Sequence, residues 1–258
     1  MMSQRIGFTR PLPAPRRLLG DVLQVAQRVP VAIVERKMLL TSTAQTRARA
    51  VPRPGWCAVF TKAWAMVCKR RPELRRCLLG GLVPRLYEHP GNVATIAVER
   101  EYQGEPTLFF VQIDSPEEAG LLELEEQLEH YKTCPLQEEA VFRQQMRRTA
   151  MPGSLRRLIL WAELHLSGRQ RARKFGTFGV VGLPGLDVRV LRQTALLTST
   201  LDYDTVAPDG SVEVRILCDQ RVIDPAVAGR ALGDLERVLR YEITTELRYL
   251  HALEERAA

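Results

Sequence analysis

The stretch Val214–Leu239, VRILCDQRVIDPAVAGRALGDLERVL, changes character in its middle. Val212–Cys218, which overlaps its start, is rich in strand-forming residues and predicts a buried strand. Asp224–Leu239 carries apolar residues at the spacing of an amphipathic helix, and Pro225 is acceptable in a first helical turn. The short polar segment between them therefore connects a strand directly to a helix.

Outward from this segment, helical and strand-like stretches are mixed along the chain, which predicts one α/β domain with a mixed sheet. Ser115 is expected to cap a helix, with Pro116 as its first residue and Glu118 completing a capping box. Leu39–Ala50 is ambiguous. The other expected helices are Pro15–Val29, Trp56–Arg70, Gln137–Thr149 and Ser154–Leu166, and the other expected strands are Val31–Val34, Leu82–Tyr87, Val93–Arg100, Pro106–Ile113, Gly176–Leu183 and Ala195–Tyr203.

The composition is that of an ordinary soluble globular protein, since 45% of the 258 residues are apolar and 26% are charged. No stretch approaches the about 18 uninterrupted apolar residues of a spanning helix, so we expect no membrane span. Five cysteines are scattered without a C-x-x-C pair, so neither a disulfide framework nor a structural zinc site is indicated. The four histidines show no metal-ligand spacing, and we expect no metal site. These features indicate a cytoplasmic protein.

Charge is distributed in blocks along the chain. Residues 1–80 carry 16 Lys and Arg against 3 Asp and Glu, and residues 81–140 carry 3 against 13. Residues 141–180 carry 9 against 1, and the remainder carries 9 against 13. Such blocks suggest segments that meet within the fold or across a subunit interface, and a polyanion-binding surface is the alternative. Because no helix-turn-helix, RRM or zinc-finger pattern is present, nucleic acid is not the expected partner.

The segment Val214–Leu239 resembles the end of the catalytic domain of the dihydrolipoamide acyltransferases, the core subunits of 2-oxoacid dehydrogenase complexes. In that family an apolar strand leads into Asp-His-Arg-x-x-Asp-Gly and then into a helix. Asp219, Arg221 and Asp224 match this motif. The segments Cys57–Leu74, Asn92–Glu118 and Lys174–Val188 follow in the family's order, while Leu121–Arg173 has no good counterpart.

The resemblance implies the α/β fold of the coenzyme A-dependent, chloramphenicol-acetyltransferase-like acyltransferases, a two-layer sandwich of a mixed β-sheet and flanking helices. We expect a single domain over residues 1–258, with a matched core at 15–240 and a C-terminal helical extension at 241–258. Because the chain begins almost at the matched region, no lipoyl or peripheral-subunit-binding domain is expected. The resemblance also implies a homotrimer that could build a larger assembly. Coenzyme A or acyl-coenzyme A is the implied ligand, and no covalently bound cofactor is expected.

The family's reaction, as the resemblance implies it, needs two chemical groups that this chain has replaced. The motif His removes a proton from the thiol of dihydrolipoamide or coenzyme A, and a hydroxyl on a Gly-Thr-Phe strand donates to the oxyanion. The His position is Gln220, whose amide cannot take up a proton near neutral pH. The hydroxyl position, counted from Gly176-Thr177-Phe178, is Val181, unless a shifted alignment lets Thr177 or a residue of Thr198-Ser199-Thr200 supply the hydroxyl.

Losing two such groups together suggests a chain that kept its fold and dropped its reaction. We therefore interpret the protein as a pseudo-acyltransferase with a binding or scaffold role, whose partner is an acyl carrier or another protein. The first alternative is an active acyltransferase that uses Cys218, or a water held by Gln220 and Asp224. The second is a polyanion-binding protein. The residues assigned to the substrate channel are Arg221, Thr177, Val181 and Gly182.

Overall fold

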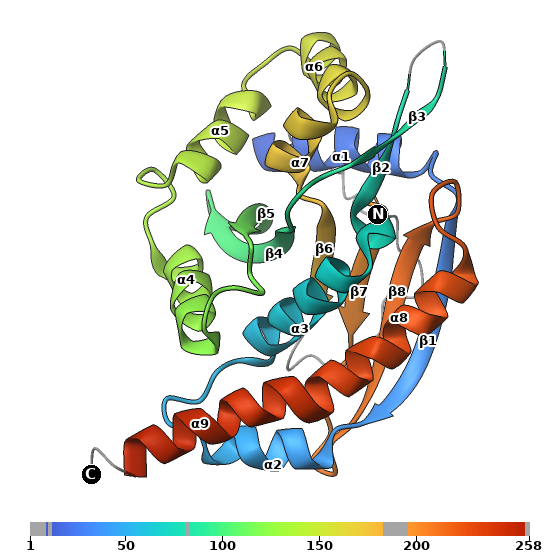
Figure 1. The fold of residues 1–258 in the computed structure, drawn as a ribbon. Helices are drawn as coiled ribbons and strands as arrows, with labels where there is room; N and C mark the ends of the chain where they lie inside the picture. Colours follow the sequence, from blue (N-terminus) through green and yellow to red (C-terminus); the bar gives the residue numbers. More distant parts are fainter. Residues whose placement is uncertain (1–8, 10–11, 81–82, 183–195, 256–258) are drawn as a thin grey trace, which may run out of the picture.

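The central sheet of this computed structural model has six strands in the order β1-β8-β7-β6-β4-β5 (Figure 1). The structure describes residues 9, 12–80, 83–182 and 196–255. Strand β6 runs parallel to both of its neighbours, and the remaining neighbouring strands are antiparallel, so the sheet is mixed. Strands β2 and β3 form a separate two-stranded ribbon. The strands are β1 (Val31–Leu39), β2 (Arg76–Leu79), β3 (Arg85–Glu88), β4 (Val93–Tyr102), β5 (Glu105–Asp114), β6 (Phe178–Gly182), β7 (Ser199–Tyr203) and β8 (Ser211–Asp219).

The helices are α1 (Ala14–Ala26), α2 (Thr41–Arg49), α3 (Trp56–Arg70), α4 (Leu121–Thr133), α5 (Ala140–Thr149), α6 (Gly153–His165), α7 (Gly168–Phe175), α8 (Pro225–Val238) and α9 (Thr244–Glu255), with a 3-10 turn at Pro72–Arg75 and a π-helical turn at Leu239–Ile243. Helices α3, α4 and α8 pack against one face of the sheet, and α8 continues through the π-helical turn into α9 (Figure 1). Helices α1, α5 and α6 come together over the other face, beside β4, β5 and β6. The expected α/β sandwich with a mixed sheet is confirmed.

Side chains along the strands alternate between the two faces of the sheet, and the face on the α3–α8 side holds the main core. In β8 the side chains of Val214, Ile216 and Cys218 belong to that core, and the residues between them point to the opposite face. Helix α3 contributes two fully buried aromatic rings, Phe60 and Trp64, and Phe60 stacks on Tyr203 of β7 with 4.2 Å between ring centroids. Burying a Phe-sized side chain contributes about 1.5–3 kcal/mol, so this layer fixes the sheet.

The helix expected to begin at Ser115 begins later, and that prediction was wrong. Ser115 has a φ of 46°, a left-handed conformation, and its amide donates to the Asn92 carbonyl as the chain leaves β5. A residue with that backbone reverses the chain and does not start a helix. Helix α4 begins at Leu121, and the Glu123 carboxylate accepts a hydrogen bond from the Gly120 amide. The ambiguous stretch 39–50 is the end of β1 followed by α2.

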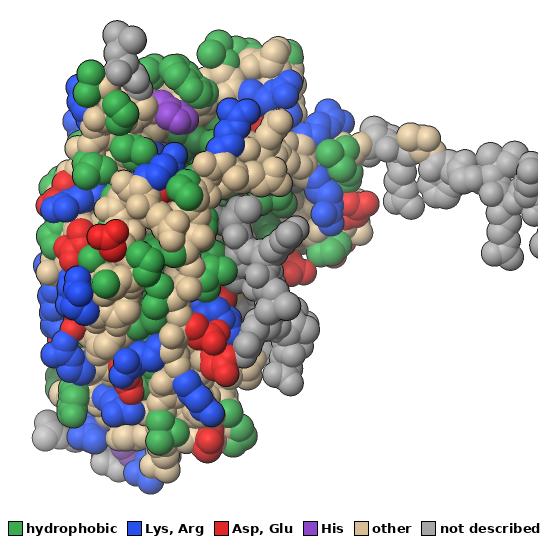
Figure 2. Space-filling view, turned by 90° about the vertical axis from the view of Figure 1, so that its right-hand side faces the viewer, with side chains coloured by type: hydrophobic (Ala, Val, Ile, Leu, Met, Phe, Trp, Pro, Cys, Tyr) green, Lys and Arg blue, Asp and Glu red, His purple; other side chains and the backbone are tan. Residues whose placement is uncertain are grey.

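The prediction that oppositely charged blocks meet within the fold is confirmed. Basic residues of α3 pair with acidic residues far along the chain, with Lys62 2.6 Å from Glu246, Arg70 2.5 Å from Glu242 and Lys69 3.1 Å from Glu118. On the face drawn in Figure 2, Lys and Arg side chains are interspersed with Asp and Glu and do not form one basic field. Over the described part of the chain, none of the helices combines the length and the hydropathy needed to cross a bilayer.

Candidate functional site

The polar turn after β8 holds Gln220 at the surface. The backbone amide of Gln220 donates to the Pro30 carbonyl at 3.0 Å, and the backbone amides of Val222 and Ile223 donate to the Asp219 carbonyl. These bonds fix the backbone of the turn between β1 and β8, while the Gln220 side chain remains exposed. The sequence motif therefore forms an ordered turn that presents residue 220 to solvent or to another molecule.

Asp219 and Arg221 form the ion pair of this turn. Asp219 is 2% exposed, and its two carboxylate oxygens accept from Arg221 Nε at 2.9 Å and Arg221 Nη2 at 2.7 Å. This pairing raises the pKa of the Arg221 guanidinium. Asp224, the second Asp of the motif, is exposed, and none of the ion pairs formed among the described residues includes it. The first Asp of the motif, and not the second, carries the pair in this chain.

Cys218 is buried within the sheet, where a substrate cannot reach a nucleophile. It sits on β8 between Ala32 and Ser199 of the neighbouring strands and is 0% exposed. Burial raises the pKa of its thiol, which lowers the fraction of reactive thiolate at neutral pH. The geometry therefore favours a structural role for Cys218.

Alkylation of Cys218 by iodoacetamide at pH 8 should require opening of the sheet. We expect a rate on the order of 10³-fold or more below that of the urea-unfolded chain, because the thiol is covered by the stable core. Peptide-level mass spectrometry measures it, and the half-buried Cys77 of the β2–β3 ribbon is the internal control. Equal rates at Cys218 and Cys77 would contradict the buried placement.

The Gly-Thr-Phe segment leads into β6, and its residues face different surroundings. Thr177 is buried, accepts a hydrogen bond from the Val93 amide at 2.9 Å, and donates to the Val93 carbonyl at 3.2 Å, so its hydroxyl is engaged in joining β6 to β4. Gly182 packs against Tyr203, and a Cβ there would lie 2.4 Å from the ring. Val181 lies on the sheet face opposite the main core and lines a cavity. Of the three channel residues assigned on β6, Val181 is the one that borders open space.

That cavity has a volume of about 230 Å³ and lies between the sheet and helices α1, α5 and α6. Its walls are mainly apolar, which suits the hydrocarbon part of a ligand. An engineered cavity of about 150 Å³ is known to hold benzene, so this one accepts a larger group. The apolar lining includes Leu19, Leu23, Ala97, Met146, Ile159 and Val181.

Three cationic side chains line the same cavity. Arg148 pairs with Glu163 and Arg156 pairs with Asp21. For Lys174 the described residues provide neither a hydrogen bond nor an ion pair. Burial and the nearby Arg148 lower the pKa of the Lys174 ammonium, and the attraction of Glu163 opposes them. The cavity thus combines apolar walls with an ammonium that forms no ion pair among the described residues and can receive an anionic group.

Gln220 and Val181 lie far apart within one chain. Val181 is paired with Asp202, which is paired with Arg215, so these three residues form a row across β6, β7 and β8. Gln220 follows Arg215 by five residues. With a rise of about 3.3 Å per residue and about 4.8 Å between strands, Gln220 is roughly 19 Å from Val181. One chain alone therefore does not bring both positions to the same reacting atom.

Sequence reasoning missed this cavity, because its walls come from four separated parts of the chain. The helix expected at Pro15–Val29 and those expected at Gln137–Thr149 and Ser154–Leu166 do exist as α1, α5 and α6. What the sequence did not reveal is that they assemble over the second face of the sheet. The alternation in β5 between buried Phe109 and half-buried Phe110 was the available signal, since it puts a large ring on the second face as well.

Several solved structures of other proteins share this fold. The chain matches a probable dihydrolipoamide acetyltransferase from Listeria monocytogenes 4b F2365 at 15% identity, covering 90% of this chain and 94% of that one, with a TM-score of 0.63. It matches a truncated catalytic core of the 2-oxoacid dehydrogenase multienzyme complex from Thermoplasma acidophilum at 16% identity, covering 91% and 99%, also with a TM-score of 0.63. The cubic core of a pyruvate dehydrogenase multienzyme complex matches at 16% identity over 95% and 96%, again with a TM-score of 0.63.

No family model and no curated protein matches this chain. At such low identity the structural likeness establishes the fold, which is that of the dihydrolipoamide acetyltransferase catalytic cores. The likeness in fold covers nearly the whole of each chain.

Proposed function

We propose that this protein binds an acyl thioester, carried by coenzyme A or by an acyl carrier, and does not transfer the acyl group efficiently. The observation that carries the proposal is Gln220. The motif resemblance assigns it the general-base position; it lies on a well-ordered turn, and a carboxamide cannot take up a thiol proton.

Asp219 and Cys218, the two residues before Gln220, do not offer a substitute base. Asp219 is engaged with Arg221, and burial raises the pKa of the Cys218 thiol. At the oxyanion position, Val181 has no hydrogen-bond donor in its side chain. Removing one oxyanion donor costs about 3 kcal/mol of transition-state stabilisation in comparable sites, and losing a general base costs about 10²–10⁴ in rate.

The cavity supports the binding half of the proposal. Its apolar walls beside Val181 suit an acyl chain, while the ammonium of Lys174 suits a phosphate or another anionic part of the carrier. The 19 Å or so between Gln220 and Val181, estimated from strand geometry, supports a homotrimer in which one chain's turn faces a neighbour's sheet. Light scattering should then give three times the 29.2 kDa chain mass. All five cysteines are free thiols, which agrees with a cytoplasmic location.

Calorimetric titration with coenzyme A, acetyl-coenzyme A and octanoyl-coenzyme A tests the proposal, together with an assay of thioester hydrolysis and transfer. We expect binding without turnover in the natural chain. The variant Gln220→His should gain at least about 10²-fold in thioester turnover, because it restores a base of suitable pKa. Combining it with Val181→Ser should raise turnover further.

Gln220→Asn is the matched control, since it keeps the amide and supplies no base. Turnover by the natural chain at a rate typical of enzymes, about 1–10³ per second, would overturn the proposal in favour of the active-acyltransferase alternative. Absence of binding by coenzyme A and by both of its thioesters would also overturn it and would direct attention to protein partners.

A further inference from the structure

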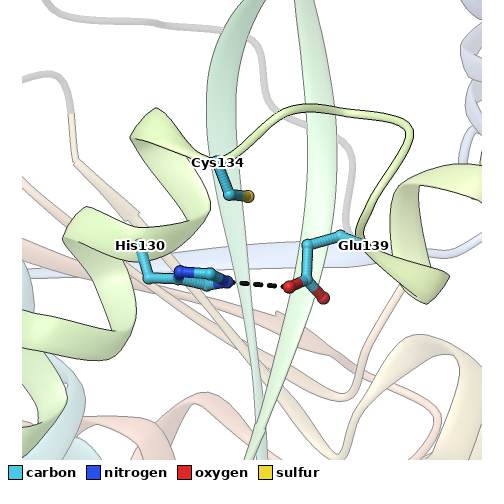
Figure 3. Close-up of side chains that lie close together, drawn as sticks. All are labelled: His130, Cys134 and Glu139. Carbon is cyan, nitrogen blue, oxygen red and sulfur yellow. Dashed lines mark hydrogen bonds and ion pairs between the residues drawn. The ribbon is translucent and has the colours of Figure 1, made fainter.

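Three side chains with different metal-binding atoms meet where α4 ends and α5 begins. His130 lies in the last turn of α4, Cys134 caps that helix, and Glu139 is the N-cap residue of α5. One imidazole nitrogen, the Cys134 sulfur and one Glu139 oxygen all lie within 4.8 Å of one another. Figure 3 shows the three side chains converging on one space, with His130 Nε2 bonded to Glu139 Oε1 at 2.7 Å.

The backbone around this cluster is held by interactions that do not involve the three side chains. Arg100 of β4 donates to the Tyr131 carbonyl at 2.7 Å and to the Cys134 carbonyl at 2.6 Å. In the connecting loop, the Glu138 amide donates to the Pro135 carbonyl at 3.0 Å. Arg143 of α5 donates to the carbonyls of Gln137 and Glu138. The backbone that carries the three metal-binding side chains is therefore already ordered, which reduces the ordering that a bound ion would require.

The donor set suits zinc better than the other common divalent ions. Thiolate and imidazole are characteristic zinc ligands, whereas Mg²⁺ and Ca²⁺ take oxygen ligands. Zinc bonds of about 2.0–2.3 Å at tetrahedral angles place neighbouring donor atoms about 3.4–3.6 Å apart. The present separations reach that arrangement if the direct His130–Glu139 contact lengthens and the sulfur moves inward by about 1 Å. A thiolate and a carboxylate together balance the charge of Zn²⁺.

Exposure of the three residues defines the remaining coordination position. Cys134 is buried at 8% exposure and forms the inner side of the cluster, whereas the His130 side chain is 54% exposed. The nearby cations are engaged elsewhere, since Lys132 pairs with Glu129 at 2.5 Å and Arg100 binds backbone carbonyls. Within the described part of the chain, no fourth His, Cys, Asp or Glu joins this group, so water or a group of another molecule is the expected fourth ligand.

We propose that His130, Cys134 and Glu139 bind one Zn²⁺ with an open fourth position. On binding, the Cys134 S–H proton and the proton that His130 Nε2 shares with Glu139 leave to solvent, and the neutral imidazole keeps its other proton on Nδ1. The sulfur–zinc, nitrogen–zinc and oxygen–zinc bonds then replace the hydrogen bond between His130 and Glu139. The site lies apart from Gln220 and does not depend on acyl binding. It joins α4 to α5, and α5 forms a wall of the cavity.

Titration of the purified full-length chain with Co²⁺ under a phosphine reductant tests the site. We expect one equivalent to bind, with visible bands of tetrahedral cobalt and a near-ultraviolet sulfur-to-cobalt charge-transfer band, and Zn²⁺ should displace it. Cys134→Ser should abolish the charge-transfer band, and His130→Ala should weaken Zn²⁺ binding at least 10-fold. His130 is exposed, so its variant tests the site even if Cys134→Ser fails to fold.

Two matched variants control for loss of a thiol or of a carboxylate outside the proposed site. Cys77→Ser removes a half-buried thiol elsewhere, and Glu138→Gln removes an exposed carboxylate next to Glu139, and both should leave cobalt binding unchanged. The proposal is overturned if no charge-transfer band forms, or if His130→Ala leaves Zn²⁺ affinity unchanged. In either case His130 and Glu139 form a simple surface ion pair.

Discussion

Replacing Arg215 by Met should destabilise the protein by roughly 3–5 kcal/mol at neutral pH, the range measured when one partner of a buried ion pair is removed. Arg215 is 5% exposed on the second face of the sheet. Its guanidinium bonds Asp202 at 2.9 Å, Asp204 at 2.6 Å and Glu35 at 2.5 Å, and Glu213 lies 3.5 Å away. The hydrogen bonds that Arg215 donates to these carboxylates, those to Asp204 above all, raise its pKa, so the side chain remains charged throughout the accessible pH range.

The loss caused by Arg215→Met should shrink as the pH falls. Without this cation the clustered carboxylates repel one another. Since carboxyl groups take up protons at about pH 4, acidification should weaken that repulsion in the variant. In the natural protein the same change removes negative charge that Arg215 binds.

Urea unfolding followed by circular dichroism between pH 4 and pH 8 measures both effects. Arg230→Met, at an exposed position of α8, is the control and should change stability by less than about 0.5 kcal/mol. A loss below about 1 kcal/mol for Arg215→Met at pH 7, or a loss that grows on acidification, would contradict the assigned role.

The strand–turn–helix segment 214–239 could be predicted because its signals are local. Apolar residues before Asp219 and helical periodicity after Pro225 are properties of the chain itself, and both elements form as expected. The start of α4 could not be predicted in this way. Ser-Pro-Glu-Glu is an acceptable helix start, but the bond between the Ser115 amide and the Asn92 carbonyl makes the same residues a turn. A contact between β4 and the chain leaving β5 overrides the local preference.

The candidate sites also divide into residues with a local sequence signal and residues that only the fold brings together. Gln220 was identified from a motif of contiguous residues, whereas Lys174 acquires its unpaired position only when α7 is placed against the cavity. His130 and Cys134, four residues apart on α4, share a helical face, which is a signal in the sequence. Glu139 joins them only because the loop between α4 and α5 folds back. A search restricted to pairs of histidines misses such a mixed set.

Gly176→Ala should destabilise the protein by at least about 3 kcal/mol, the second large effect that we expect. Gly176 has φ 77° and ψ 179°, a backbone region that is essentially restricted to glycine. An added Cβ would lie 2.2 Å from Thr95 Oγ1 and 2.8 Å from the Val93 carbonyl oxygen. That carbonyl accepts the Thr177 amide at 2.8 Å, so the overlap would separate β6 from β4 where their pairing begins. Chemical unfolding measures the loss.

Gly233→Ala is the opposite case and serves as the control. Gly233 lies within α8 with no atom within 4 Å of an added Cβ, so alanine should stabilise the protein by up to about 1 kcal/mol. A small loss for Gly176→Ala would show that β6 adapts and that its glycine has another purpose, such as contact with a phosphate. A large loss would show that β6 cannot adapt and that the backbone at this position requires glycine. Because Gly179 approaches Thr200 and Gly182 approaches Tyr203, glycines along GTFGVVG let β6 lie close to its neighbours, which places Val181 at the cavity wall.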